Sequence, residues 1–156
     1  MDLKFHSAVV FVKDLQVLKA FYQQVLNLEV EYDFGNNMMF KNGFSLWQVG
    51  DEHQISKYTT AHKTGASNFE LYFETENIDE VVAKIEPIEL AYIHQLVEEP
   101  WGQKTMRFYD PEQNIVEIAE SLFGFVFRME QEGLSVEVIS NKTGIDLDGI
   151  TKILGV

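Results

Sequence analysis

The chain has 156 residues, a hydrophobic fraction of 46% and a formal net charge of −13. This length and composition predict one compact domain with a short appendage, and they exclude an intrinsically disordered protein. The strong negative charge opposes binding to the phosphate backbone of nucleic acid and to anionic membranes. We therefore expect no nucleic-acid or membrane partner.

The features that govern targeting predict a cytoplasmic protein. No apolar run is long enough to cross a membrane, and the first residues lack the basic and long apolar regions of a signal peptide. The chain has no cysteine, which excludes disulfides and thiolate metal sites and fits an intracellular location.

The first half of the chain predicts the order strand, helix, strand, strand, strand. We expect a buried strand over residues 4–12, followed by Asp14 as the N-cap of an amphipathic helix over 15–26. Asn27 suits the left-handed residue that ends a helix, and Asn42-Gly43 is a strong hairpin signal. The three later strands are expected at 28–33, 37–41 and 44–49.

The same order returns after a polar connection over residues 51–66. Residues 67–74 alternate with the period of a strand, which places Phe69, Leu71 and Phe73 on one face. Asn77 then caps a helix that Pro87 ends. Further strands are expected at 91–97, 104–109 and 114–119. The repetition predicts two βαβββ modules, at 1–50 and 67–120, within a domain that spans 1–120.

These modules predict an α+β fold. Each module alone exposes one face of its sheet, so we expect eight strands to form one curled, mixed sheet around a shared interior, with the helices outside. Glu117 lies within the otherwise apolar last strand, where a carboxylate is costly unless it is paired, hydrogen-bonded or bound to a metal. We therefore expect Glu117 to line the interior, with His6 of the first strand near it.

The chain resembles the vicinal oxygen chelate superfamily, which includes glyoxalases, bleomycin-resistance proteins and extradiol dioxygenases. The resemblance rests on His6, on residues 12–14 followed by 21–28, and on residues 110–117, where Asp-Pro and a tight turn precede Glu117. It covers residues 4 to 120 and implies a small-molecule pocket within the sheet and a homodimer. In many members a divalent metal acts there as a Lewis acid on vicinal oxygens of the substrate.

The resemblance implies metal ligands on the first and last strands of each module. His6 and Glu117 match two of these positions, whereas the other two fall on Leu46 and Asn68. If an ion such as Zn, Ni, Mn or Fe binds, we expect His6 and Glu117 to hold it. Asn68 or Glu70 would then complete its coordination or contact the substrate.

Other interpretations of these residues stay open. His6 is either a metal ligand or a hydrogen-bonded histidine of the pocket wall. Glu117 is a ligand, a general base or a carboxylate paired with a cation such as Arg107. Glu70 and Tyr72 either bind the substrate or are residues of the barrel wall whose polar groups bond to water. Trp101 either stacks on a ligand or packs on its own hairpin.

Neighbouring polar residues are interpreted as structural. His94 on the expected strand at 91–97 could reach the interior, but we expect it to be an ordinary surface or core histidine. We expect Glu98-Glu99 to be a solvated turn.

Two functions fit this pattern. One is metal-assisted isomerisation, lysis or addition on a small oxygenated molecule, as in enzymes of the lactoylglutathione lyase type, with Glu117 in the catalytic site. The other is metal-independent binding of a compound, as in bleomycin-resistance proteins, for which the net charge of −13 suits a cationic ligand. The departures at Leu46 and Asn68 favour the binding function.

Residues 121–156 predict a helical extension. One helix is expected from 121 to about Gly133, followed by two short helices with Ser135 and Asp146 as N-caps. The last two resemble a helix-turn-helix hairpin, as in a DNA-binding regulator. The extension has three basic and five acidic residues, however, and so lacks a basic surface for DNA. We expect an arm for packing or dimerisation.

Overall fold

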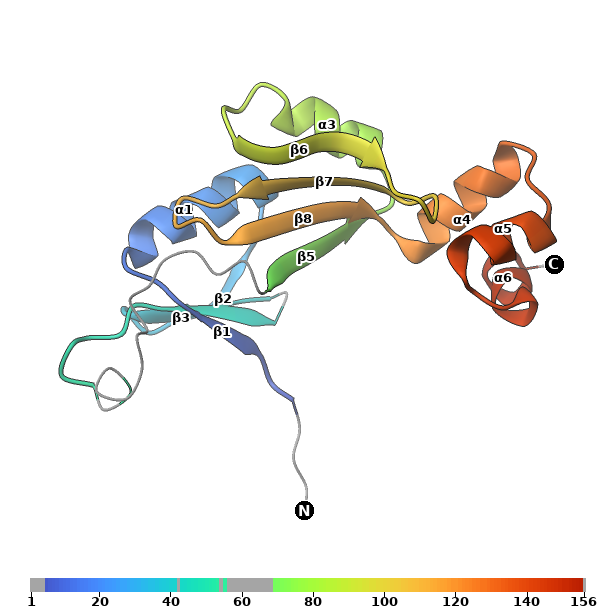
Figure 1. Ribbon diagram of the computed structural model, residues 1–156. Coiled ribbons are helices and arrows are strands. Elements are labelled where there is room, and N and C mark those ends of the chain that lie inside the picture. The colour runs from blue at the N-terminus through green and yellow to red at the C-terminus, as the bar shows by residue number, and fades with distance from the viewer. Residues whose placement is uncertain (1–4, 42, 54, 56–68, 156) are drawn as a thin grey trace, which may run out of the picture. The chain divides into compact units, whose positions relative to one another are not determined.

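The computed structural model describes residues 5–41, 43–53, 55 and 69–155. These residues form eight strands and five helices (Figure 1). The chain divides into two compact units, each described here by itself. The first unit comprises Met1–Phe69 and Asp110–Asn114, and the second comprises Glu70–Tyr109 and Ile115–Val156.

The first unit contains a four-stranded sheet in the order β1-β4-β3-β2. Strands β1 and β4 run parallel, whereas β4 with β3, and β3 with β2, run antiparallel. The elements are β1 (Ala8–Phe11), α1 (Leu15–Leu26), β2 (Val30–Asp33), β3 (Asn37–Phe40) and β4 (Phe44–Trp47).

Helix α1 begins and ends where its sequence predicts. The Asp14 carboxylate accepts hydrogen bonds from the backbone N–H groups of Gln16 and Val17, which satisfies two donors that the helix itself leaves free. Asn27 ends the helix with φ of 52°, in the left-handed region. The buried Tyr22 ring contacts the rings of Phe40 and Phe44, so α1 covers the sheet face that carries them.

The turn Asp110–Asn114 belongs to the first unit and is anchored to α1. The Tyr22 hydroxyl donates a hydrogen bond of 2.8 Å to Asp110, and this carboxylate also accepts from the backbone N–H of Glu112. Glu112 in turn accepts from the N–H groups of Lys13 and Asp14 at 2.7–3.0 Å. The conspicuous Asp-Pro-Glu segment therefore stabilises the start of α1.

The second unit repeats the topology of the first, with strand order β5-β8-β7-β6. Strands β5 and β8 are parallel, and the other two pairs are antiparallel. The elements are β5 (Glu70–Thr75), α3 (Ile78–Ile85), β6 (Ala91–Glu98), β7 (Lys104–Tyr109) and β8 (Ile115–Glu120). The expected α+β fold of two βαβββ modules is confirmed, with the eight strands bonded as two four-stranded mixed sheets.

Helix α3 covers one face of the second sheet. Asn77 caps it by accepting a hydrogen bond from the N–H of Glu80 at 3.2 Å. Its Val82 lines a small hollow together with Tyr92 and Met106. Met106 pairs with Ile118 across β7 and β8, so the apolar side chains of these strands face the helix.

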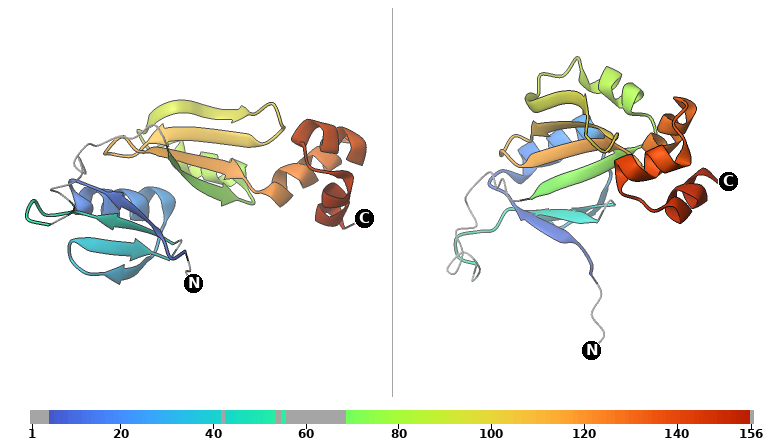
Figure 2. Two further views of the ribbon diagram at one scale, coloured as in Figure 1. Left: turned by 60° about the horizontal axis from the view of Figure 1, so that its bottom comes forward. Right: turned by 45° about the vertical axis from the view of Figure 1, so that its right-hand side comes forward.

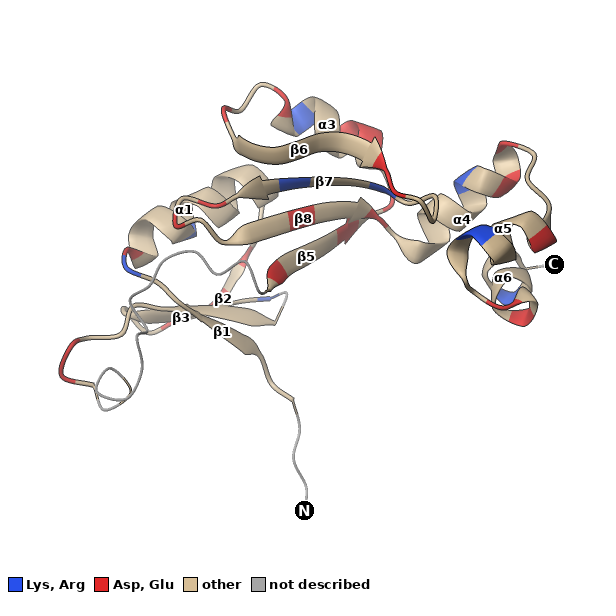
Figure 3. Cartoon of the chain, viewed as in Figure 1, with Lys and Arg blue, Asp and Glu red and all other residues tan. Residues whose placement is uncertain are grey.

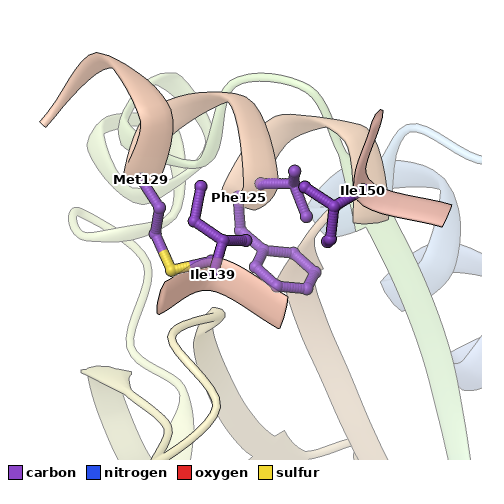
Figure 4. Close-up of a cluster of buried hydrophobic side chains, with 5 residues drawn as sticks. Phe125, Met129, Ile139 and Ile150 are labelled. Atoms are coloured by element: carbon purple, nitrogen blue, oxygen red, sulfur yellow. The ribbon is translucent and has the colours of Figure 1, made fainter. Parts of the chain in front are cut away.

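The C-terminal extension forms three packed helices (Figures 1 and 2), and the expected helical extension is thus present. They are α4 (Leu122–Gln131), α5 (Val136–Thr143) and α6 (Leu147–Leu154). Their shared core contains five buried side chains, which Figure 4 shows between the helices: Phe125, Val126, Met129, Ile139 and Ile150. Ser121, Ser135 and Asp146 cap the three helices as N-caps.

The extension is also joined to the sheet by charged side chains. Arg128 of α4 donates to Glu120 at the end of β8 at 2.7 Å and to the carbonyl of Gly102 at 2.6 Å. Lys142 of α5 pairs with Glu98 of β6 at 2.7 Å. These contacts join the extension to the sheet within the second unit, and its role as an arm for packing or dimerisation stays a prediction.

Several expected strands differ in extent by a few residues, and parts of the chain lie outside the description. The expected strand over 4–12 is formed over Ala8–Phe11, and residues 1–4 are outside the described part. Most of the expected connection at 51–66 also lies outside the described residues. Among the helices of the described ranges, none has the length and apolar character needed to cross a membrane.

Candidate ligand-binding site

One face of the second sheet carries a row of polar side chains. Strand alternation and register bring them together, because Tyr72 of β5 and Arg107 of β7 both pair with Glu117 of β8. Glu70 lies two residues before Tyr72 and so points to the same face. The strands display acidic positions on β5 and β8 beside basic positions on β7 (Figure 3). Glu70, Tyr72 and Glu117 therefore share the face opposite α3, and their role in binding a ligand stays a prediction.

Arg107 is the centre of this face. Its Nε donates to Glu70 at 3.1 Å, and its Nη1 donates to Glu99 at 2.9 Å. Its Nη2 forms an ion pair with Glu117. The same Nη1 contacts Nε2 of His94 at 3.0 Å. One guanidinium thus contacts three carboxyl groups and one imidazole.

Glu117 is the buried member of the cluster, with 4% of its side chain exposed, against 38% for Glu70. Burial raises the pKa of Glu117 to about 7, supported by a hydrogen bond with the Glu70 carboxyl and opposed by the charge of Arg107. A bond between two carboxyl groups needs a proton on one of them, which favours the neutral form. Glu117 therefore changes its charge near neutral pH.

A second set of hydrogen bonds extends from this cluster to the β6–β7 turn. The Gln103 amide donates to the Tyr72 hydroxyl at 3.0 Å and to the Glu120 carbonyl at 2.7 Å. The Trp101 indole N–H donates to the Gln103 side chain at 3.0 Å. Tyr72 and Trp101 still expose 46% and 39% of their surface, so both aromatic faces are accessible. Trp101 is fixed by its own hairpin and remains exposed beside the cluster.

Two interpretations from the sequence need correction. Glu99 does not lie in a solvated turn, because its carboxylate accepts hydrogen bonds from Arg107 and Thr105. The hydrogen bond from Arg107 holds the pKa of Glu99 below its usual value. His94 is also part of the cluster through Nε2. Gln103, His94 and Glu99 were missed as site residues; only the alternation of β6 could have indicated His94.

His6 lies in the first unit, on a different polar and aromatic hollow. This hollow of about 410 Å³ is lined by His6, Ser7, Val9, Tyr32, Phe34, Asn37, Met39 and Ser45. The rings of Tyr32 and Phe34 stack there with centroids 6.1 Å apart. His6 is exposed and accessible to a ligand at this surface.

The structure places Leu46 in the core of the first unit. Leu46 is fully buried and pairs with Met38, and it lies on the same side of β4 as Phe44, which contacts α1. Successive side chains of β4 point to opposite faces of the sheet, so Ser45 faces the hollow and Leu46 points away from it. Leu46 is therefore a packing residue. Asn68, the other departure, lies outside the described residues.

The sequence of residues 5–123 matches the model of the glyoxalase-like domain. The chain belongs to this glyoxalase-like family. The match ends within α4, so most of the three-helix extension lies beyond the family domain. No curated protein sequence matches the chain significantly.

Solved structures with the same fold agree with this assignment. A protein of unknown function from Agrobacterium tumefaciens str. C58 is 32% identical, with a TM-score of 0.69, and the match covers 78% of this chain and 97% of that one. A lactoylglutathione lyase from Agrobacterium tumefaciens is 22% identical, with a TM-score of 0.59, over 80% and 99% of the two chains. The fosfomycin resistance protein FosX from Listeria monocytogenes is 20% identical, with a TM-score of 0.57, over 78% and 95%. The last two likenesses show the fold alone.

The residues around Glu117 do not fit a divalent metal ion. The carboxylates that such an ion would need are already bonded to the guanidinium of Arg107. Within the described residues, no three His, Asp or Glu side chains are spaced to hold an ion. His6 belongs to the first unit and Glu117 to the second, and their joint role as ligands stays a prediction.

Proposed function

We propose that this glyoxalase-like protein binds a small oxygenated molecule that carries a positive charge. The site is the face of the second sheet around Arg107 and Glu117. One observation carries the proposal: three carboxyl groups surround a single guanidinium. The cluster is therefore acidic overall and attracts a cation.

The exposed edge of the cluster is suited to such a ligand. Glu70 is the most exposed of the three carboxylates and can pair with an ammonium group while it keeps its contact with Arg107. Tyr72 and Trp101 provide flat surfaces beside it, on which a ring or a sugar face can stack. Gln103 links the two aromatic side chains and fixes their orientation.

The charge of the whole chain acts in the same direction. A net charge of −13 raises the local concentration of cations and speeds their encounter with the site. This behaviour corresponds to the metal-independent, bleomycin-resistance type of function. We infer that this type of function describes the protein better than the metal-dependent lyase type does, because the carboxylates that a metal ion would need are already paired with Arg107.

A catalytic function without a metal is the second candidate, and the pKa of Glu117 near 7 favours it. A carboxyl group with this pKa can accept a proton from a bound molecule and return it. Glu117 would then act as the general base of an isomerase or lyase, with Arg107 beside the negative charge that develops.

A screen with matched ligand pairs tests the binding function. Thermal shift measurements would compare bleomycin and a set of oxygenated primary amines with the N-acetyl derivative of each amine. We expect stabilisation by amines and none by the uncharged derivatives. For the best amine, calorimetry should show weaker binding to Glu70→Gln and unchanged binding to Glu89→Gln, an exposed control with the same charge change. Equal binding to both variants, or no amine that binds, would refute this function.

A further inference from the structure

We propose that Arg107 closes this site to divalent metal ions, because its guanidinium occupies the position at which Glu70, Glu99, Glu117 and His94 would otherwise bind one. The protein thus has a latent metal site that its own side chain fills. This inference does not depend on which organic ligand the protein binds.

The contacts of Arg107 leave little room for a divalent metal ion between the carboxyl groups. Its three nitrogens each contact a different carboxyl group, and 22% of its side chain is exposed. A guanidinium stays charged at every physiological pH, so it cannot leave by losing a proton. A metal ion would have to displace the guanidinium, which the chain itself holds beside the carboxyl groups. The displaced guanidinium would then be left without a charged partner.

The hydrogen bonds of His94 provide independent support. Its Nδ1 lies 2.9 Å from the carbonyl oxygen of Gln95, which can only accept a hydrogen bond, so Nδ1 carries the proton. Its Nε2 lies 3.0 Å from Nη1 of Arg107, which can only donate, so Nε2 presents its lone pair to the guanidinium. Metal-binding histidines commonly have this arrangement, with one nitrogen donating to a backbone carbonyl and the other free to coordinate.

Removal of Arg107 would leave the donor set of a metal site. Carboxylates and a neutral imidazole are ligands for zinc and manganese. They are now spaced around a guanidinium, which is larger than an ion, and this spacing explains why the described residues lack a ready metal site. Glu70 is exposed and can move inward, while Glu117 is held in the sheet.

Metal titration of Arg107 variants tests the inference. Manganese binding would be followed by the loss of the free-ion signal in electron paramagnetic resonance, and zinc binding by calorimetry. We expect Arg107→Met to bind one ion at least about tenfold more tightly than the wild type. Arg107→Lys keeps the charge but has one nitrogen in place of three, so it should bind the ion more weakly than Arg107→Met does. The double variants Arg107→Met/His94→Ala and Arg107→Met/Glu117→Gln should lose the gain.

Several results would overturn the inference. They are tight binding of an ion at this site by the wild type, no gain in Arg107→Met, or a gain that survives both double variants. If Arg107→Met folds only with manganese or zinc present, that requirement supports the inference. If it stays unfolded with either ion, Arg107→Gln replaces it, and absence of a gain there refutes the proposal. No organic ligand is used, so failure of the amine screen would leave this result unaffected.

Discussion

The charge state of Glu117 gives a sharp prediction about stability and pH. In the folded chain its pKa is about 7, against 4.5 for an ordinary glutamate. Folding therefore favours the protonated form, and the stability that this form provides is fully present below pH 4.5. It is lost as the pH rises from 4.5 to about 7. Because one pKa unit corresponds to about 1.4 kcal/mol, the loss amounts to about 3 kcal/mol.

The variant Glu117→Gln isolates this effect, because glutamine has the shape of the protonated carboxyl group and does not titrate. Urea unfolding of both proteins would be measured between pH 4.5 and 8. We expect similar unfolding free energies at the acidic end, and an advantage of about 3 kcal/mol for the variant above pH 7. Glu89→Gln is the control, and its curve should run parallel to that of the wild type. A constant difference between Glu117→Gln and wild type across this range would refute our account of the burial of Glu117.

Three further predictions concern the rest of the chain. Glu112→Ala removes the acceptor of the Lys13 and Asp14 N–H groups. In urea unfolding it should lower the free energy of unfolding by about 3 kcal/mol, and Glu112→Gln should lower it less. An unchanged urea midpoint of Glu112→Ala would contradict this role. Phe125→Ala should reduce hydrogen-exchange protection in α5 and α6 by about 3–4 kcal/mol, whereas exposed Val138→Ala should change little. Light scattering should give a homodimer, twice the 18.0 kDa of one chain, and a monomer would contradict the expectation from the family.

Much of the fold could be predicted from local sequence signals because the structure satisfies them locally. Asp14 and Asn77 cap their helices through bonds to residues two or three positions away. The alternation around Leu71 assigns the faces of β5 correctly, since its polar positions lie beside Arg107 and its apolar ones face α3. Patterns of this kind need no knowledge of distant contacts.

The functional residues were harder to predict, because their roles depend on partners in other elements of the sheet. The Glu70–Arg107 contact joins β5 to β7, and the Glu99–Arg107 contact joins the residue after β6 to β7; no short motif marks either contact. Glu98 and Glu99 are adjacent, yet one pairs with Lys142 and the other with Arg107. Strand order and register decide such partners, and no local pattern in the sequence shows which strands lie side by side.

The first strand shows a different limit of sequence reasoning. Both of its faces carry apolar and polar side chains, so alternation alone does not select the face that α1 covers. The structure buries Val10 and leaves Val9 in the hollow beside Ser7. Leu46 of β4, which the family resemblance placed at a ligand position, lies in the core.

The most direct test of the central claim is a crystal structure of the wild-type protein grown with excess manganese, with anomalous diffraction measured. We predict no anomalous peak beside Glu117, and Arg107 in contact with Glu70, Glu99 and Glu117. A manganese ion coordinated by Glu117, with His6 or any other residue, would contradict the account.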